Sequence, residues 1–97
     1  MGKGIDATTR LGVLRALLLS AASEYAASEA DGRIVETIEY QDARGIVLQA
    51  LALAQHLPAS QPQQQRFRQM LQAVPSAMPP QRALMSPQQF RALAKLN

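Results

Sequence analysis

The chain has 97 residues, which suffices for one modest hydrophobic core but not for two. Apolar residues make up 47% of it, chiefly Ala and Leu, and there is no Trp; this composition is typical of closely packed helices. The absence of Cys excludes disulfides, thiol chemistry and cysteine-based zinc sites. No apolar run approaches the roughly 18 residues that cross a bilayer, and the N-terminus does not read as a signal peptide. We therefore expect either a cytoplasmic protein or an excised part of a longer exported one.

Charge divides unevenly along the chain. Residues 1–42 hold all seven acidic residues and four basic ones (net −3), whereas residues 43–97 hold six basic residues and no acid (net +6). Such a split can steer the second half toward an anionic partner. Because the basic residues are dispersed, mutual packing of the two halves is favoured over a nucleic-acid surface, and we do not expect nucleic-acid binding.

Apolar spacing predicts four helices, over residues 8–31, 37–57, 61–74 and 86–96, within a single domain that spans residues 1–97. The first stripe runs through Leu11, Leu14, Leu18, Ala22 and Tyr25. We predict an all-α fold, an antiparallel helical hairpin extended to a small four-helix bundle. The expected N-caps, in chain order, are Asp6 or Thr8, Thr37, Ser60 or Gln61, and Ser86.

Glycines are expected to shape the helical hairpin. Gly32 would end the first helix in the left-handed conformation, with Ile34 and Val35 tucked under the turn. Gly12, Gly45 and the alanines would let the two helix backbones approach closely.

Tyr25 lies near the end of the first helix of this hairpin, and Tyr40 near the start of the second. The structural interpretation is that each buries its ring and hydrogen-bonds its hydroxyl to the connecting loop.

No enzyme motif is present. The serines and threonines have no nucleophile-elbow context, there is no phosphate-binding glycine loop, and no strand pattern appears. The single histidine, His56, lies near the expected end of the second helix, where a capping role is favoured over a catalytic one. We expect a protein that is not an enzyme.

An acidic cluster is the remaining candidate site. Asp31, Glu36, Glu39 and Asp42 surround the predicted hairpin turn, and carboxylates beside a phenol are hard oxygen donors suited to Ca²⁺, Mn²⁺ or Fe³⁺. The alternative is that these carboxylates cap helix ends and keep this end of the bundle soluble. On spacing alone the alternative is favoured.

A family resemblance rests on five of these residues. The spacing of Tyr25, Gly32, Ile34, Glu39 and Tyr40 resembles the extracytoplasmic N-terminal helical domain of bacterial ferric-permease-family iron transporters. The likeness covers about residues 20–57 well, and a Ser-Pro-led helix at residues 86–96 fits loosely. The transporting Arg-Glu-x-x-Glu motif of that family has no counterpart here, so this chain cannot itself be the permease.

The resemblance implies a non-catalytic accessory domain of an iron transport protein, on the periplasmic or extracellular side. Its role would be sensory, docking or weak metal binding, with Fe³⁺ as the implied metal and a membrane permease domain of the same polypeptide as the implied partner. The alternative is a cytoplasmic helical adaptor or chaperone that holds a partner helix in an Ala/Leu groove.

Overall fold

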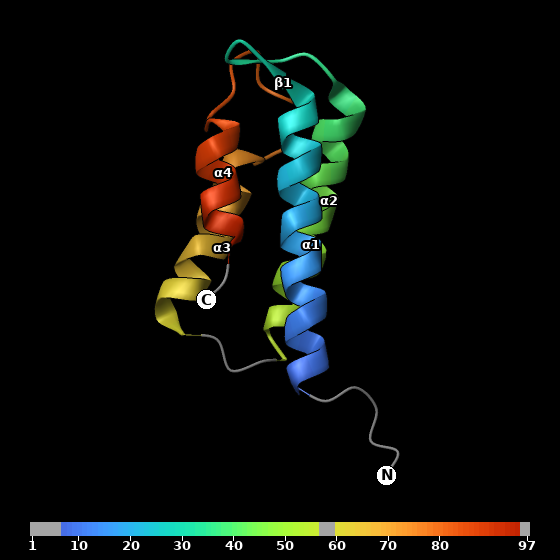
Figure 1. The fold of residues 1–97 in the computed structure, drawn as a ribbon. Helices are drawn as coiled ribbons and strands as arrows, with labels where there is room; N and C mark the ends of the chain where they lie inside the picture. Colours follow the sequence, from blue (N-terminus) through green and yellow to red (C-terminus); the bar gives the residue numbers. More distant parts are fainter. Residues whose placement is uncertain (1–6, 57–59, 96–97) are drawn as a thin grey trace.

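Four helices make up most of the protein, whose computed structural model describes residues 7–56 and 60–95 (Figure 1). They are α1 (Ala7–Ser28), α2 (Thr37–Ala54), α3 (Gln61–Ala73) and α4 (Pro87–Ala94). Two short strands, β1 (Glu29–Ala30) and β2 (Arg33–Ile34), join α1 to α2. The prediction of an all-α four-helix fold is confirmed.

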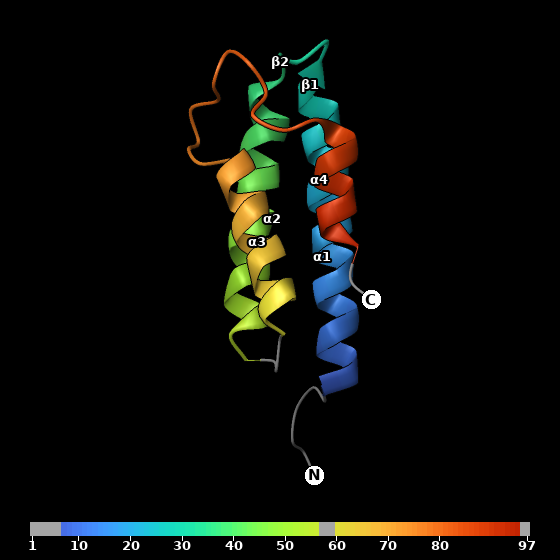
Figure 2. The ribbon, with the colours of Figure 1, turned by 90° about the vertical axis from the view of Figure 1, so that its left-hand side faces the viewer.

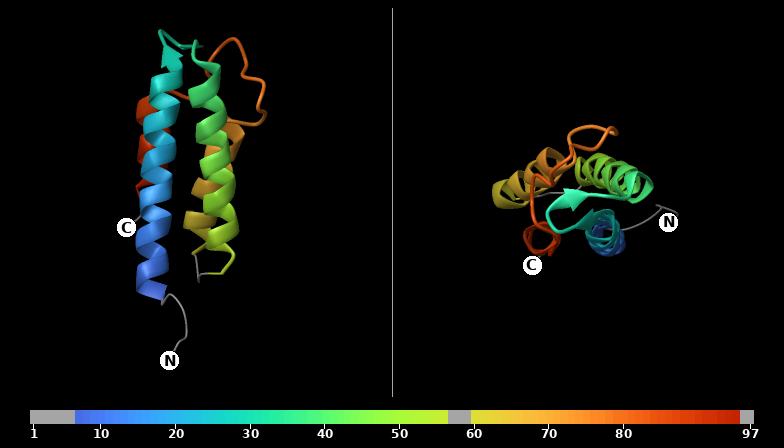
Figure 3. Two further views of the ribbon diagram at one scale, coloured as in Figure 1. Left: turned by 90° about the vertical axis from the view of Figure 1, so that its right-hand side faces the viewer. Right: turned by 90° about the horizontal axis from the view of Figure 1, so that it is seen from above.

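The helices pack as two neighbouring pairs. The longest two, α1 and α2, lie antiparallel along most of their length, while α4 packs on α1 and α3 packs on α2 (Figure 2). Seen from the end, the four helices occupy the corners of a bundle (Figure 3). The β hairpin closes one end of this bundle, which we call the hairpin end.

The core follows the predicted stripes. Each helix places an aromatic side chain fully inside: Tyr25, Tyr40, Phe67 and Phe90. Because neighbours three and four residues apart share one helix face, smaller side chains fill the layers between these rings. The buried members of those layers are Leu14, Leu18, Ala21, Ala22, Ala43, Val47, Ala50, Ala54, Met70, Ala73, Val74 and Ala94.

Alanines, and not Gly12 or Gly45, supply the small buried side chains of α1 and α2. Gly12 and Gly45 are both exposed, and a Cβ added to either would have no atom within 4 Å. The expectation that these glycines allow close helix approach is therefore wrong. Buried Ala21, Ala22 and Ala43 have the small side chains that this approach requires.

The first helix ends earlier than predicted. It stops at Ser28, three residues before the expected end at Asp31, because residues 29–34 pair as an antiparallel hairpin. The pairing joins Glu29 with Ile34 and Ala30 with Arg33. These two strands were not predicted, because two residues each are too few to show a strand pattern in the sequence.

Helix caps were predicted with mixed success. Ser60 and Ser86 each cap a helix through a full capping box, with Gln63 and Gln89 as the reciprocal partners. Thr37 is not the N-cap of α2, because it is the first residue of that helix. The N-cap is Glu36, whose side chain makes no capping hydrogen bond.

The predicted helix bounds also differ at other ends. α3 stops one residue earlier than predicted, at Ala73, and α4 covers residues 87–94 instead of 86–96. Thr8 lies inside α1, not before it. α2 ends at Ala54, before the predicted end at residue 57. The predicted cap Asp6 and the residues Leu57 and Leu96 themselves lie outside the described residues.

Candidate functional site

The tip of the hairpin is a two-residue turn in the left-handed conformation. Asp31 has φ 53° and Gly32 has φ 80°, the pattern of a type I′ turn, for which Asp-Gly is a preferred pair. The backbone N–H of Gly32 donates to the Glu29 carboxylate at 2.8 Å. Gly32 is therefore left-handed, as predicted, but it serves a strand turn instead of a helix C-terminus.

Ser28 links the end of α1 to the start of α2. Its carbonyl oxygen accepts from the N–H groups of Val35 at 2.7 Å and Glu36 at 3.2 Å. Its buried hydroxyl donates to the Tyr25 carbonyl at 2.6 Å. These bonds satisfy polar groups that a helix end leaves without intrahelical partners, so the chain enters α2 at a fixed angle.

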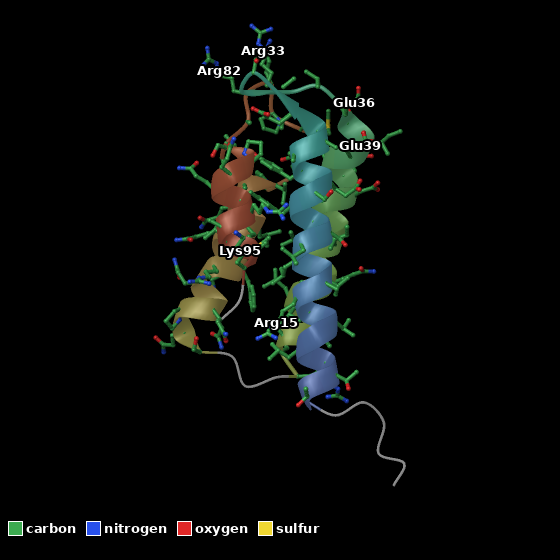
Figure 4. The ribbon with its side chains drawn as sticks, in the orientation of Figure 1. Arg15, Arg33, Glu36, Glu39, Arg82 and Lys95 are labelled. Atoms are coloured by element: carbon green, nitrogen blue, oxygen red, sulfur yellow. The ribbon has the colours of Figure 1, made fainter. Side chains whose placement is uncertain are left out.

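The connector between α3 and α4, residues 74–86, pairs with the hairpin. The Ala83 N–H donates to the Gly32 carbonyl at 2.8 Å, and the Ile34 N–H donates to the Gln81 carbonyl at 3.3 Å. Arg33 and Arg82 face each other in this bridge, and both side chains project from the hairpin end (Figure 4). The hairpin end is therefore built from segments about 50 residues apart in sequence.

Tyr25 fastens this connector to α1. Its hydroxyl donates to the Met85 carbonyl at 2.6 Å and accepts from the Met85 N–H at 3.3 Å. Its ring stacks on Phe90 of α4, with centroids 4.5 Å apart and planes 9° from parallel. The ring of Tyr25 is buried, as predicted, but the predicted hydroxyl bond to the hairpin loop is wrong, because the hydroxyl bonds to the α3–α4 connector.

Tyr40 is buried without such a partner. Its hydroxyl has no hydrogen bond to any residue that the structure describes, and the same is true of the buried Nε of Arg44 one turn later. The backbone of Ser76 faces the hydroxyl without reaching hydrogen-bond geometry. The expected bond from Tyr40 to the connecting loop is thus not present in the described structure.

The pKa values of both phenols lie above the ordinary value. Burial is the main cause in each case. The Met85 backbone opposes the rise of the Tyr25 pKa, and the Arg44 charge opposes that of Tyr40. Both side chains are therefore neutral hydrogen-bond donors at pH 7.

The four predicted metal ligands are spread along the hairpin end. Asp31 lies in the β turn, Glu36 precedes α2, and Glu39 and Asp42 lie in its first two turns (Figure 4 labels Glu36 and Glu39). In the described part of the chain, no group of three or more His, Asp or Glu side chains is placed to hold a metal ion. Asp42 does line a shallow depression together with Glu24 of α1.

The most exposed large apolar side chains lie in segments at the hairpin end. The four most exposed large ones are Val35, Ile38, Met78 and Leu84, at 54%, 68%, 82% and 57%, and we call them the hairpin-end apolar side chains. The other exposed large apolar residues, on α1 and α2, lie at 40–44%. Val35 was expected under the turn and instead faces solvent, whereas its neighbour Ile34 is half-buried.

Two of these side chains flank one contact between α2 and the connector. The Gln41 side-chain amide donates to the Ala77 carbonyl at 3.2 Å; Ile38 lies one turn before Gln41, and Met78 follows Ala77. Neither Ile38 nor Met78 was predicted as a functional residue. Ile38 falls outside the apolar stripe of its helix, and this signal was available from the sequence.

Comparisons with known proteins agree with this architecture. No curated protein and no solved structure is similar enough to match the chain. Within the described residues, no helix combines the length and apolar character that a membrane span needs. The family described as the iron permease-associated 4-helix bundle domain matches residues 4–96. The chain therefore belongs to this iron permease-associated family, as its resemblance to ferric-permease-family domains predicted.

Proposed function

We propose that this chain is a non-catalytic accessory domain that docks on the membrane part of an iron permease through its hairpin end. The observation that carries the proposal is the position of the four hairpin-end apolar side chains, all at least 54% exposed at one end of a closed bundle. Exposed apolar groups of this kind mark protein interaction sites when they gather in one region. The family assignment supports an iron permease as the partner, because the domain is associated with iron permeases.

Hydrogen bonds and a buried tyrosine support the hairpin end. Hydrogen bonds from the connector to Gly32 and Ile34 hold the turn, and Tyr25 anchors the same connector to α1. A surface held in this way loses little conformational freedom on binding, so more of the contact energy remains for affinity. An adaptor unrelated to iron transport has no support from the family match.

Charge substitution tests the docking role. In cells that produce the whole transport protein, Ile38→Glu and Met78→Glu should lower the rate of iron uptake, because a carboxylate at an apolar contact must lose its hydration on binding. The matched control is Leu48→Glu, a 40% exposed position on the same helix, away from the hairpin end. If Ile38→Glu and Met78→Glu take up iron at the same rate as the Leu48→Glu control, docking through this surface is rejected.

Weak iron binding is a second candidate, favoured by the pairing of Asp42 with Glu24. The depression that these carboxylates line also contains the side chains of Gln41 and Gln49, so amide oxygens and water would complete a hard-ligand set. Iron here would be cargo. Among the predicted ligands, Glu39 lies closest along the helix to Asp42.

A melting experiment tests iron binding. Ferric citrate or Mn²⁺ should raise the melting temperature, since a ligand that binds only the folded state stabilises it. The double variant Glu39→Ala/Asp42→Ala should abolish the rise. An unchanged melting curve for the original protein would dismiss metal binding and leave the docking proposal standing.

We also infer that the domain faces the periplasm or the cell exterior, as the family resemblance implies. The chain has no Cys, so a single cysteine can report its location. The variant Gln65→Cys places a cysteine at an exposed position of α3. A membrane-impermeant maleimide should then label the domain in cells whose inner membrane is intact. Labelling only after that membrane is broken would place the domain in the cytoplasm.

A further inference from the structure

The side of α4 that is turned toward α1 bears two basic residues. Arg91 and Lys95 are exposed, and because they are one helical turn apart they share one side of the helix. The opposite flank of α4 carries Gln89 and Leu93, which line a cavity together with residues of α3. Arg91 and Lys95 therefore lie away from α3, on the flank nearest α1.

Arg15 supplies a third positive charge, from α1. Glu24, the single acidic residue of this helix, lines the depression shared with α2, so it marks the flank of α1 that faces α2. Arg15 precedes Glu24 by about two and a half helical turns, so the two side chains leave α1 on opposite sides. Figure 4 shows Arg15 extending toward the side on which α3 and α4 lie. Arg15 therefore belongs to the same surface as Arg91 and Lys95.

We call Arg15, Arg91 and Lys95 the basic face. Within the described residues, α1 directs its one carboxylate to the other side, and α3, the connector and α4 contain no acidic residue. Arg66 of α3 donates from its guanidinium to the Lys95 carbonyl at 2.6 Å, so it adds positive charge beside this face. A surface that carries charge of one sign attracts partners of the opposite sign.

We propose that the basic face lies on the anionic phospholipid surface beside the permease. This proposal rests on the proposed function, because docking on the membrane part of a permease keeps the domain near lipid headgroups. The three cations come from two helices and are spread along the face, which suits a plane of phosphate groups better than one small anion. Leu19, 41% exposed and one turn after Arg15, lies on the same side and can enter the headgroup region.

Vesicle flotation of the purified chain tests the basic face. Vesicles that contain phosphatidylglycerol should bind the protein, vesicles of phosphatidylcholine alone should not, and added salt should weaken the binding. The double variant Arg91→Gln/Lys95→Gln should lower the affinity about tenfold or more, since each cation lost from an anionic surface weakens binding several-fold. This variant keeps the backbone carbonyl of residue 95 that Arg66 binds.

A charge-matched control removes two cations from another place. Arg33→Gln/Arg82→Gln has the same net charge as the first double variant, and both residues are exposed at the hairpin end. It should bind the vesicles almost as well as the original protein. Equal losses in the two double variants would mean that net charge alone attracts the protein, and would overturn the proposal. Failure of the original protein to bind phosphatidylglycerol vesicles at low salt, or tighter binding to a polyglutamate peptide than to the vesicles, would also overturn it.

Spin labels report which face meets the membrane. Because the chain has no Cys, Ala26→Cys and Gln49→Cys each give a single labelling site, and both positions are exposed. Ala26 lies about three turns after Arg15 on the same side of α1, whereas Gln49 of α2 lines the depression on the other side. Phosphatidylglycerol vesicles should shield the label at residue 26, but not that at residue 49, from a water-soluble relaxing agent; the reverse pattern would contradict the proposal. These experiments use lipid alone, so their failure would leave the iron-uptake test of docking unaffected.

Discussion

Tyr25 joins parts of the fold that are distant in sequence. It belongs to α1, its hydroxyl bonds to Met85 sixty residues later, and its ring stacks on Phe90 of α4. A buried tyrosine needs a partner for its hydroxyl, and here that partner is both backbone groups of one connector residue. The side chain therefore fixes where the connector crosses the bundle.

The variant Tyr25→Phe should lower the free energy of unfolding by about 1–3 kcal/mol. It keeps the ring but removes two hydrogen bonds, and it leaves backbone groups of Met85 without their partner. Urea unfolding followed by circular dichroism measures the change. Unaltered stability would mean that the connector holds its place without this residue.

The same variant should also change the response to alkali. The pKa of Tyr25 lies above its unfolded value of about 10, mainly through burial, so the folded state holds its proton more tightly. That contribution to stability is complete below pH 10 and is lost as the pH rises through the folded pKa. Melting temperatures between pH 8 and pH 11.5 should fall less steeply for Tyr25→Phe.

At the scale of elements, the hairpin and the connector form one unit. The bridge between Arg33 and Arg82 and the bonds at Gly32 and Ile34 place the connector beside β2. Neither strand is long enough to persist alone, since isolated two-stranded hairpins are marginal in water. The connector and the adjoining helices thus hold the turn in place.

Two glycines should respond in opposite directions to alanine. Gly45 is exposed in the middle of α2 with open space around it, so Gly45→Ala should stabilise the protein by about 0.4–1 kcal/mol. Gly32 has φ 80°, so Gly32→Ala should cost about 1–2 kcal/mol.

Denaturant unfolding of both glycine variants, beside the original protein, measures these changes. Destabilisation by Gly45→Ala would show that this position is packed after all, as the sequence analysis assumed.

Local sequence signals explain which elements could be predicted. The stripes of α1 and α2 and the Ser-x-x-Gln caps of α3 and α4 depend on residues three or four apart, so the pattern is visible in the chain. The Asp31–Gly32 turn also carried a strand signal that was interpreted as a helix end. The contacts of Tyr25 with Met85, and of Gln41 with Ala77, span 60 and 36 residues, and no local pattern specifies such pairs.

At the scale of the whole molecule, the two ends of the bundle differ. The hairpin end holds Glu36, Glu39, Arg33 and Arg82 (Figure 4). It also holds the hairpin-end apolar side chains. Elsewhere, Arg66 of α3 donates to the Lys95 carbonyl at 2.6 Å and ties α3 to the end of α4. The family was recognisable from the spacing of five residues in and around the β hairpin. The exposed apolar surface at the same end could be recognised only from the fold.

Site-specific photo-crosslinking tests the docking claim most directly. A photoreactive amino acid at position 38 or 78, in cells that produce the whole transport protein, should crosslink the domain to the membrane part of the permease. The same amino acid at Gln65, exposed on α3, should not. Crosslinks from residue 65 alone, or from none of the three positions, would contradict docking through the hairpin end.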